Sequence, residues 1–329
     1  MDIVKDFYVI AVCSNPVRYA SRYRLFNDFK QHMGDVGAQM LTVEQAFGNR
    51  PFVLTERDRD DHLQFRTEHE LWHKENMINL GIEYLCQWKP DWKYVAWIDA
   101  DIMFQRRDII TETVQQLQHY DFVQMWSHVA DLGPAGQIVK QDVSFMYQYH
   151  QNGMEAPKTA KGVPSRYGYG AHEKGYFWHP GYAWAARRSA LDSVRLFDKG
   201  ILGSSDHHMA MALVGKGELS VPSGLSAEYY KAVQTWERLA ELRIRRNVGF
   251  VPGTITHGWH GPKTKRKYTE RWDVLRKSQF DPHADLTRDA QGLYRLNDFM
   301  DARSIRLRDD IRLYFRDRDE DSNYIGGGV

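Results

Sequence analysis

The stretch Tyr94-Val95-Ala96-Trp97-Ile98-Asp99-Ala100-Asp101 joins an unbroken apolar run to two carboxylates. Such a run suits a strand that is buried on both faces of a mostly parallel sheet. Open sheets of this kind bind ligands beyond the carboxyl ends of their strands, where Asp99 and Asp101 fall. Side chains two residues apart on an extended segment share a face, so both carboxylates can point at one cation, or at a cation and a ribose. Carboxylate oxygens select hard ions, and the motif predicts a Mg²⁺ or Mn²⁺ site for nucleotide phosphates.

Length, composition and charge narrow the classes of protein to which this chain could belong. With 329 residues, 42% of them hydrophobic, the chain can bury a substantial core. Its formal net charge of +1 means that binding to nucleic acid would need a local basic patch. Cys13 and Cys86 cannot form a disulfide framework, and their apolar surroundings predict buried thiols in a reducing compartment. Because we find no signal-type segment and no membrane-spanning run, we expect a soluble, cytoplasmic protein.

Apolar periodicity predicts that strands and helices alternate over roughly the first 130 residues, which is typical of an α/β fold with a mostly parallel, Rossmann-like sheet flanked by helices. A capping box at Thr67 and Glu70 predicts the start of the helix before the aspartate strand, and Lys89-Pro90 predicts its end. The expected strands are residues 7–12, 41–47, 94–98 and 122–126, and the expected helices include residues 19–29, 71–85 and 109–117.

The second half of the chain is less regular. Residues 148–175 are rich in Gly, Pro, Lys and Tyr, which predicts a long loop over one end of the sheet. Alternating Arg and Asp from residue 263 predicts solvated helices with ion pairs. We expect a domain over 1–262, with a nucleotide half (about 1–130) and an acceptor half (about 131–262), and a charged helical C-terminal extension over 263–329. Further expected elements are a strand at 182–186, a helix capped by Ser204-Ser205 that runs to residue 214, a helix at 227–242 and a strand at 249–256.

A second motif is Thr254-Ile-Thr-His257-Gly-Trp-His260-Gly-Pro-Lys263, an apolar strand followed by groups that bind metals or anions. Histidines three residues apart on a strand lie on opposite faces, so we expect only one of them to reach a metal. Zinc is disfavoured because helical His-x-x-x-His spacing and cysteine partners are lacking. The simpler alternative is that both histidine rings form hydrogen bonds to neighbouring groups and bind no metal.

Four features in this order resemble a known family: the strand ending in Asp-x-Asp, the stretch Gly181-Tyr-Ala-Trp184, Asp206 at the start of a helix, and a late histidine before Gly and Lys. Together they are similar to metal-dependent nucleotide-sugar glycosyltransferases of the GT-A fold, family 2-like and similar to virus-encoded members, over about residues 5–265. The resemblance implies hexosyltransferase activity (EC 2.4) with a nucleotide-sugar donor, most often a UDP-sugar, and Mn²⁺ or Mg²⁺.

The resemblance also implies roles for single residues. Asp206 would be the general base of inverting members, although an aspartate at a helix N-terminus also has a structural explanation. Lys263 and Arg266 would add positive charge at the diphosphate. The residues implied at the donor and metal are Val12, Ser14, Asn15, Arg18, Arg22, Lys74, Asn79, Asp99, Asp101 and His257. Those implied at the acceptor or sugar are Trp178, His179, Gly181, Tyr182, Trp184, His207 and His260, the last also being the reserve metal ligand.

Two other functions fit part of the sequence. A metal-dependent nuclease or phosphotransferase also uses aspartates and histidines, but it would need more carboxylates soon after Asp101. A non-catalytic nucleic-acid-binding module could use the basic residues between Lys263 and Lys277. For a transferase the acceptor stays open: DNA with hydroxymethylated bases, a polysaccharide or a protein. Phosphate-loop motifs of kinases and ATPases are absent from the sequence.

Overall fold

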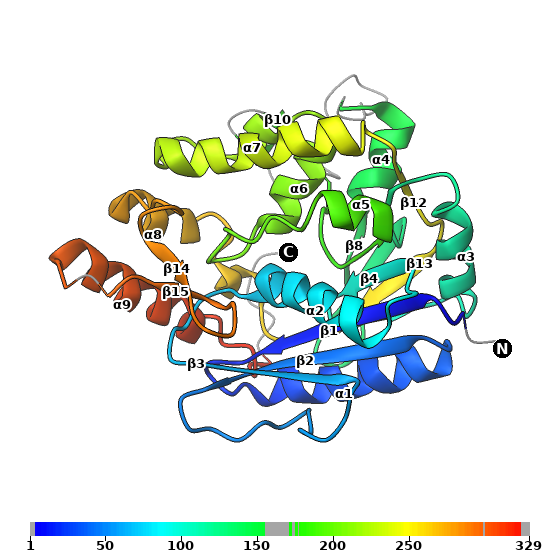
Figure 1. Cartoon of the computed structure of the whole chain (residues 1–329), viewed down its shortest axis with the longest axis horizontal. Helices are drawn as coiled ribbons and strands as arrows, with labels where there is room; N and C mark the ends of the chain where they lie inside the picture. Colours follow the sequence, from blue (N-terminus) through cyan, green and yellow to red (C-terminus); the bar gives the residue numbers. More distant parts are fainter. Residues whose placement is uncertain (1–3, 155–170, 173–174, 177, 299, 324–329) are drawn as a thin grey trace.

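A seven-stranded sheet in the order β12-β6-β11-β4-β1-β2-β3 forms the centre of the molecule (Figure 1). In this sheet β11 runs antiparallel to β4 and β6, and every other neighbouring pair is parallel. The computed structural model describes residues 4–154, 171–172, 175–176, 178–298 and 300–323, and it confirms an α/β fold with a mostly parallel sheet. The strands are β1 (Phe7–Ser14), β2 (Gln39–Phe47), β3 (His62–Thr67), β4 (Tyr94–Ile98), β6 (Phe122–Gln124), β11 (Ala183–Arg187) and β12 (Val248–Phe250).

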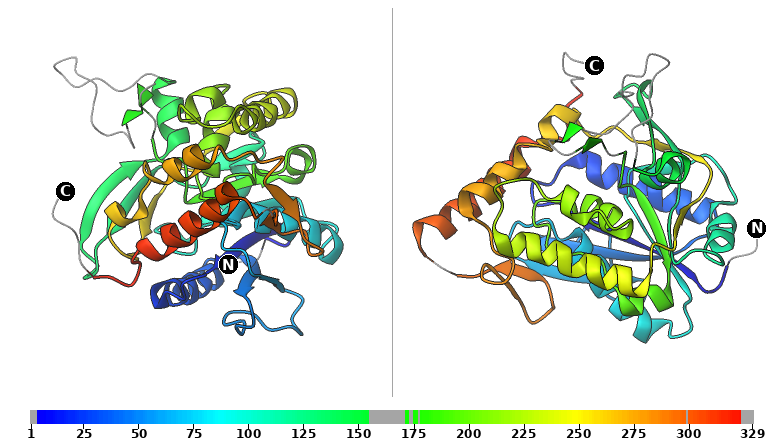
Figure 2. Two further views of the ribbon diagram at one scale, coloured as in Figure 1. Left: turned by 90° about the vertical axis from the view of Figure 1, so that its left-hand side faces the viewer. Right: turned by 90° about the horizontal axis from the view of Figure 1, so that it is seen from above.

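Helices cover both faces of this sheet, with α1 on one side and α6 and α7 on the other (Figures 1 and 2). Alternate side chains of β1 enter the two cores: Tyr8 and Ile10 join one, Val9 and Ala11 the other. This explains why the central strands are apolar at successive positions. The helices are α1 (Ala20–Asp35), α2 (Lys74–Trp88), α3 (Ile109–Gln116), α4 (Phe145–Asn152), α5 (Arg188–Ser193), α6 (Ser205–Leu213), α7 (Ala227–Arg243), α8 (Arg271–Ser278) and α9 (Ala302–Asp317), with 3₁₀ turns at Gly217–Ser220 and Lys263–Arg266.

A second sheet of four strands, in the order β5-β13-β7-β8, begins directly after the aspartate motif. Within it β13 is antiparallel to β5 and parallel to β7, so the segments that follow β4, β6 and β12 lie side by side. Its strands are β5 (Ile102–Phe104), β7 (His128–Leu132), β8 (Ile138–Val143) and β13 (Thr254–His257). Antiparallel pairing also joins β9 (Ala171–His172) to β10 (Gly175–Tyr176) and β14 (Leu286–Arg288) to β15 (Tyr294–Leu296).

The end of the described chain returns to the start of α1. Tyr19, the residue before α1, makes no side-chain cap. The carboxylate of Asp321 instead accepts hydrogen bonds from the backbone N–H groups of Ala20 and Ser21, both at 2.8 Å. The expected C-terminal helices are present as α8 and α9, but Arg318 and Glu320 beyond α9 are buried, not solvated.

Several local predictions were wrong for identifiable reasons. Thr67 ends β3 and accepts a hydrogen bond from the N–H of His69, whereas the helix begins later, at Lys74. The strand expected at 249–256 is divided by Pro252, which has no N–H to donate, so β12 and β13 belong to different sheets. Ser204 adopts a φ of 73° and makes no side-chain cap for α6.

The predicted loop over 148–175 begins too early, because Ser144 caps α4 and this helix continues to Asn152. Most of the remainder of that loop (155–170, 173–174) lies outside the described residues. The sequence analysis also missed β3, β7, β8, β14 and β15, which are short or carry many polar side chains. In the described part of the chain, no helix combines the length and apolarity needed to cross a bilayer.

Candidate active site

A cavity of about 530 Å³ opens where β1 and β4 end. This is the edge at which the sequence predicted a ligand, and the volume is typical of small-molecule sites. Side chains from the C-terminal part of the chain, among them Arg271 and Arg318, form part of its wall. The site residues expected from sequence that line it are Val12, Ser14, Arg22, Lys74, Asp99, Asp101, His179, Tyr182, Asp206, His207, His257, His260, Lys263 and Arg266.

Asp101, His257 and His260 converge in this cavity, with one potential ligand atom from each lying within 4.8 Å of the others. Asp101 Oδ2 is 2.9 Å from His260 Nε2 and 3.6 Å from His257 Nε2. The two Nε2 atoms are 3.3 Å apart. Three groups from two distant parts of the chain therefore form one cluster.

Strand pairing produces this convergence. The register of β13 against β5 places His257 opposite Ile102, the neighbour of Asp101, and Gly258 N–H donates to the Asp101 carbonyl at 2.7 Å. β13 ends at His257, and the chain then turns through Gly261, whose φ is +81°. The alternation of a strand therefore does not apply to His260, and both rings reach the cluster where one was expected.

Asp131 on β7, which the sequence analysis missed, holds the ring of His257. The two residues are register partners, and His257 Nδ1 lies 2.9 Å from Asp131 Oδ1. Tyr182 donates to the same oxygen at 3.0 Å, and Lys263 forms an ion pair with the other oxygen. Burial alone would raise the pKa of Asp131, but His257 and Lys263 hold it far below its usual range. Asp131 is therefore an anion that accepts from Nδ1 and turns Nε2 toward the cluster.

One oxygen of the Asp101 carboxylate is left without a hydrogen bond in the described part of the chain. This oxygen is Oδ1, and it is buried. Burial alone would raise the pKa of Asp101, but the rings of His257 and His260 keep it well below its usual range. An ionised, buried oxygen without a partner is costly, so it points to a cation. Two imidazoles and one carboxylate fit a transition ion such as Mn²⁺ better than Mg²⁺, which prefers oxygen ligands.

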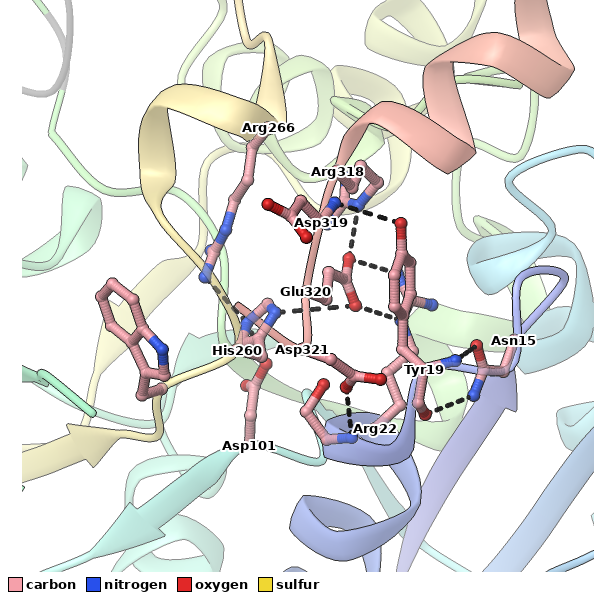
Figure 3. A network of polar contacts seen from close by, with 12 residues as sticks. Asn15, Tyr19, Arg22, Asp101, His260, Arg266, Arg318, Asp319, Glu320 and Asp321 are labelled. Carbon is pink, nitrogen blue, oxygen red and sulfur yellow. Dashed lines mark hydrogen bonds and ion pairs between the residues drawn. The ribbon is translucent and has the colours of Figure 1, made fainter. Parts of the chain in front are cut away.

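His260 also belongs to a network that reaches the C-terminal segment (Figure 3). Its Nε2 lies 2.9 Å from Arg266 Nη2, and a cation bound at this nitrogen would take the place of that contact. Its Nδ1 lies 3.8 Å from Glu320 Oε2. The side chain of Glu320 is fully buried between Arg22 and Arg318. Although burial alone would raise the pKa of Glu320, these two guanidinium groups keep it well below its usual range.

Asp99 lies apart from the group that Asp101, His257 and His260 form. β4 ends at Ile98, and Asp99 to Asp101 form a turn in which the N–H of Ile102 donates to the Asp99 carbonyl, so the two aspartates do not share the face of a strand. Asp99 instead forms an ion pair with Lys74 at the start of α2. Burial raises the pKa of Asp99, while the neighbouring carboxylates outweigh burial and raise that of Lys74.

Asp206 lies in the first turn of α6 and is half-buried on the cavity wall. Gly181 approaches it so closely that a Cβ at this position would lie 2.4 Å from Asp206 Oδ2. The expected acceptor residue Gly181 therefore leaves the space that the Asp206 carboxylate occupies, and it does not itself line the cavity.

Glu75, which follows Lys74 on α2, is a second carboxyl that the sequence analysis missed. It is 4% exposed and lines the cavity. Burial raises its pKa to about 8, with Lys74 opposing this shift and Asp206 adding to it. A glutamate at the second position of a helix is usually exposed on the surface. The local sequence therefore did not indicate that Glu75 is buried.

Glu75→Gln is expected to flatten the dependence of stability on pH. A carboxyl whose pKa rises from 4.5 to about 8 on folding favours the folded state fully below pH 4.5, and this contribution is lost as the pH rises through 8. Relative to Glu75→Gln, the wild type should lose roughly 3 to 5 kcal/mol of unfolding free energy over this window. Urea unfolding at several pH values measures this difference.

Glu83→Gln provides the control, because Glu83 is exposed on the same helix. This variant should follow the wild-type pH profile. Parallel profiles for wild type and Glu75→Gln would show that Glu75 does not keep its proton in the folded protein.

Other expected site residues lie outside the cavity wall. Asn15 bonds the backbone N–H and carbonyl of Tyr19 with its side chain, and Asn79 bonds the backbone of Leu196 in the same way. Arg18 lines a separate, much smaller pocket. Trp178 and Trp184 are core residues, as their apolar size alone would suggest.

No protein-family model matches the chain, and no curated protein matches it. A solved structure similar to it is a putative nucleotide-diphospho-sugar transferase from Desulfovibrio desulfuricans G20, at 10% identity and a TM-score of 0.31, over 94% of this chain and 98% of that one. Another is the catalytic domain of Drosophila beta1,4galactosyltransferase 7 in complex with xylobiose, at 10% identity and a TM-score of 0.33, over 89% and 94%. These likenesses concern the fold.

Proposed function

We propose that this protein is a glycosyltransferase of the GT-A type, which moves a sugar from a nucleotide diphosphate to an acceptor hydroxyl with the help of a divalent ion. The observation that carries the proposal is the convergence of Asp101, His257 and His260 in a cavity that also presents basic side chains. When bound, the ion would neutralise the charge that develops on the diphosphate as the sugar leaves.

The basic groups supply the rest of the anion site. Arg266 is 6% exposed and forms no ion pair with a carboxylate in the described part of the chain. A buried guanidinium without an ion-pair partner of its own is unfavourable, and a diphosphate would supply one. We propose that Arg266 and Lys263 bind the diphosphate, that Asp99 and Lys74 bind the ribose or sugar, and that Val12 and Ser14 contact the nucleoside of a UDP-sugar.

Asp206 is the proposed general base. Its carboxylate lies on the wall of the same cavity, where it can take the proton of an acceptor hydroxyl as that oxygen attacks the anomeric carbon. We propose that His179, Tyr182 and His207 form the adjoining acceptor surface. The rings of His179, Tyr182 and His257 stack in succession, with centroid separations of 3.8 and 4.8 Å, so this surface is continuous with the metal cluster.

Ion pairs favour a glycan or protein acceptor over DNA. In the basic stretch that follows the cavity residues Lys263 and Arg266, Lys267 and Arg276 each pair with an aspartate. Paired charges release few counterions, so this stretch is a weak phosphate-binding face. The same pairs weaken the alternative of a non-catalytic nucleic-acid-binding module. A two-metal nuclease is also disfavoured, because Asp99 and Asp131 are bound by lysines.

Two further expectations stay proposals. A cytoplasmic, reducing location fits two free thiols, of which Cys13 is buried and Cys86 half-buried. The division between a transferase domain (1–262) and an extension (263–329) is also a proposal, although Arg271, Arg318 and Glu320 of that extension line the cavity.

Screening a panel of nucleotide sugars against the purified protein tests the proposal. With Mn²⁺ present, the true donor should raise the melting temperature by several degrees at saturating concentration, because ligand binding stabilises the folded state. The same donor should be hydrolysed slowly when no acceptor is supplied. Both effects should disappear in EDTA. A panel that includes uridine, guanosine and adenosine donors and gives neither shift nor hydrolysis would contradict the proposal.

A further inference from the structure

Each histidine of the metal cluster has a carboxylate facing its far ring nitrogen. For His257 this is Asp131, at 2.9 Å from Nδ1. For His260 it is Glu320, at 3.8 Å from Nδ1. His260 Nδ1 is buried and makes no hydrogen bond among the described residues, so Glu320 is the acceptor that its proton would face. Each imidazole therefore has a carboxylate behind it, at hydrogen-bond distance for His257 and at ion-pair distance for His260, although these carboxylates lie 189 residues apart in sequence.

Two arginines hold the carboxylate of Glu320 in place. Its side chain has no exposed surface and pairs with Arg22 through both of its oxygens and with Arg318 through Oε1. The two guanidinium groups together carry more positive charge than the one carboxylate carries negative charge. Glu320 can therefore also act as an acceptor for the His260 imidazole while the arginines still balance its charge. Arg318 is held in turn by the hydroxyl of Tyr314 at 2.9 Å.

The backbone around Glu320 is anchored to the loop that carries His260. Gly261 leaves no room for a side chain, since a Cβ there would lie 2.5 Å from the Asp319 carbonyl oxygen. Trp259 donates its indole N–H to the Ser322 carbonyl at 2.8 Å. Asp321 caps α1 on the other side (Figure 3). The carboxylate of Glu320 therefore cannot drift away from His260 unless the whole 319–322 segment detaches.

We infer that Glu320 is a positioning residue of the metal site, which holds His260 through Nδ1 so that Nε2 faces the ion. The inference rests on the proposed metal-dependent function. An imidazole that gives Nε2 to a cation must carry its proton on Nδ1, and a carboxylate acceptor there fixes the ring and makes Nε2 a stronger ligand. The last described turn of the chain thus contributes to a site built mainly by the sheet.

Binding of Mn²⁺ alone to the full-length protein tests this role. Glu320→Gln keeps the size of the side chain but removes its charge, and it should raise the Kd for Mn²⁺ about 10- to 100-fold, as measured by the EPR signal of free Mn²⁺. Asp321→Ala is the matched control. It removes the cap of α1 from the same segment without contacting His260, so it should lower the melting temperature while the Kd stays within about twofold.

The outcomes separate this inference from the proposed function. If Glu320→Gln folds and binds Mn²⁺ as tightly as the wild type, the positioning role is wrong while the transferase proposal stands. Equal weakening by Asp321→Ala would also contradict it, because attachment of the segment, not the carboxylate, would then matter. A wild type that binds no Mn²⁺ overturns both. If Glu320→Gln does not fold, Glu320→Asp is measured in its place. This variant keeps a negative charge between the arginines, but its shorter side chain moves the carboxylate away from His260. It should therefore still weaken Mn²⁺ binding several-fold.

Discussion

Replacing Asp101 with asparagine is expected to lower the rate of sugar transfer, or of donor hydrolysis, by about 1,000-fold. Asp101 is the anionic member of the cluster with His257 and His260, and its buried Oδ1 has no other partner among the described residues. An amide of the same size provides one neutral oxygen in place of a charged carboxylate. Both the affinity for Mn²⁺ and the neutralisation of the leaving diphosphate should therefore suffer. Initial rates over a range of Mn²⁺ concentrations measure this effect.

Asp99→Asn is the matched control for this prediction. Asp99 lies two residues away but is engaged by Lys74 outside the cluster. The variant should retain Mn²⁺ affinity within a few-fold, even if it binds the donor less tightly. The metal assignment would be wrong if Asp101→Asn kept wild-type affinity for Mn²⁺, or if both variants lost it equally.

Asp206→Asn is expected to lower kcat by about 10²- to 10⁴-fold, which is the usual contribution of a general base. KM for the donor and the affinity for Mn²⁺ should change little, because Asp206 belongs neither to the cluster nor to the proposed diphosphate site. Gly181→Ala should also lower kcat, since its Cβ would displace the Asp206 carboxylate. Steady-state kinetics with a saturating donor separate kcat from KM.

If Asp206 only stabilises the N-terminus of α6, its replacement should affect stability and not kcat. A carboxylate in the first turn of a helix stabilises it by about 0.3 to 1 kcal/mol through the helix dipole. Were this its only role, Asp206→Asn would lower the melting temperature slightly and leave kcat unchanged. That result would remove Asp206 from the mechanism while leaving the metal site intact.

The sequence predicted well what depends on local patterns. The apolar run before Asp99 and the stretch before His257 both proved to be strands that end at the cavity. For the first of them the reason is that burial on both faces requires continuous apolar residues. The sequence also indicated that Asp101 and His257 meet. Their actual contact, however, depends on the pairing of β5 with β13, which no local pattern encodes.

The residues that support the site were the hardest to predict. Asp131 lies on the short strand β7, and only its register with His257 gives it a role. Glu320 belongs to an Arg- and Asp-rich stretch that reads as a solvated surface. Its burial follows from contacts with Arg22, which is 298 residues away. Ion pairs between residues that lie far apart in the chain produce no periodic pattern in the sequence.

The cap of α1 by Asp321 has a consequence for synthesis of the chain. A ribosome that has begun α1 must add about another 300 residues before the group that completes this helix emerges. The counter-charge for Arg22 emerges equally late. A polypeptide that lacked Glu320 and Asp321 would therefore carry an uncapped first helix and an uncompensated arginine at the cavity. Incomplete translation products should thus be substrates for proteolysis instead of partly functional catalysts.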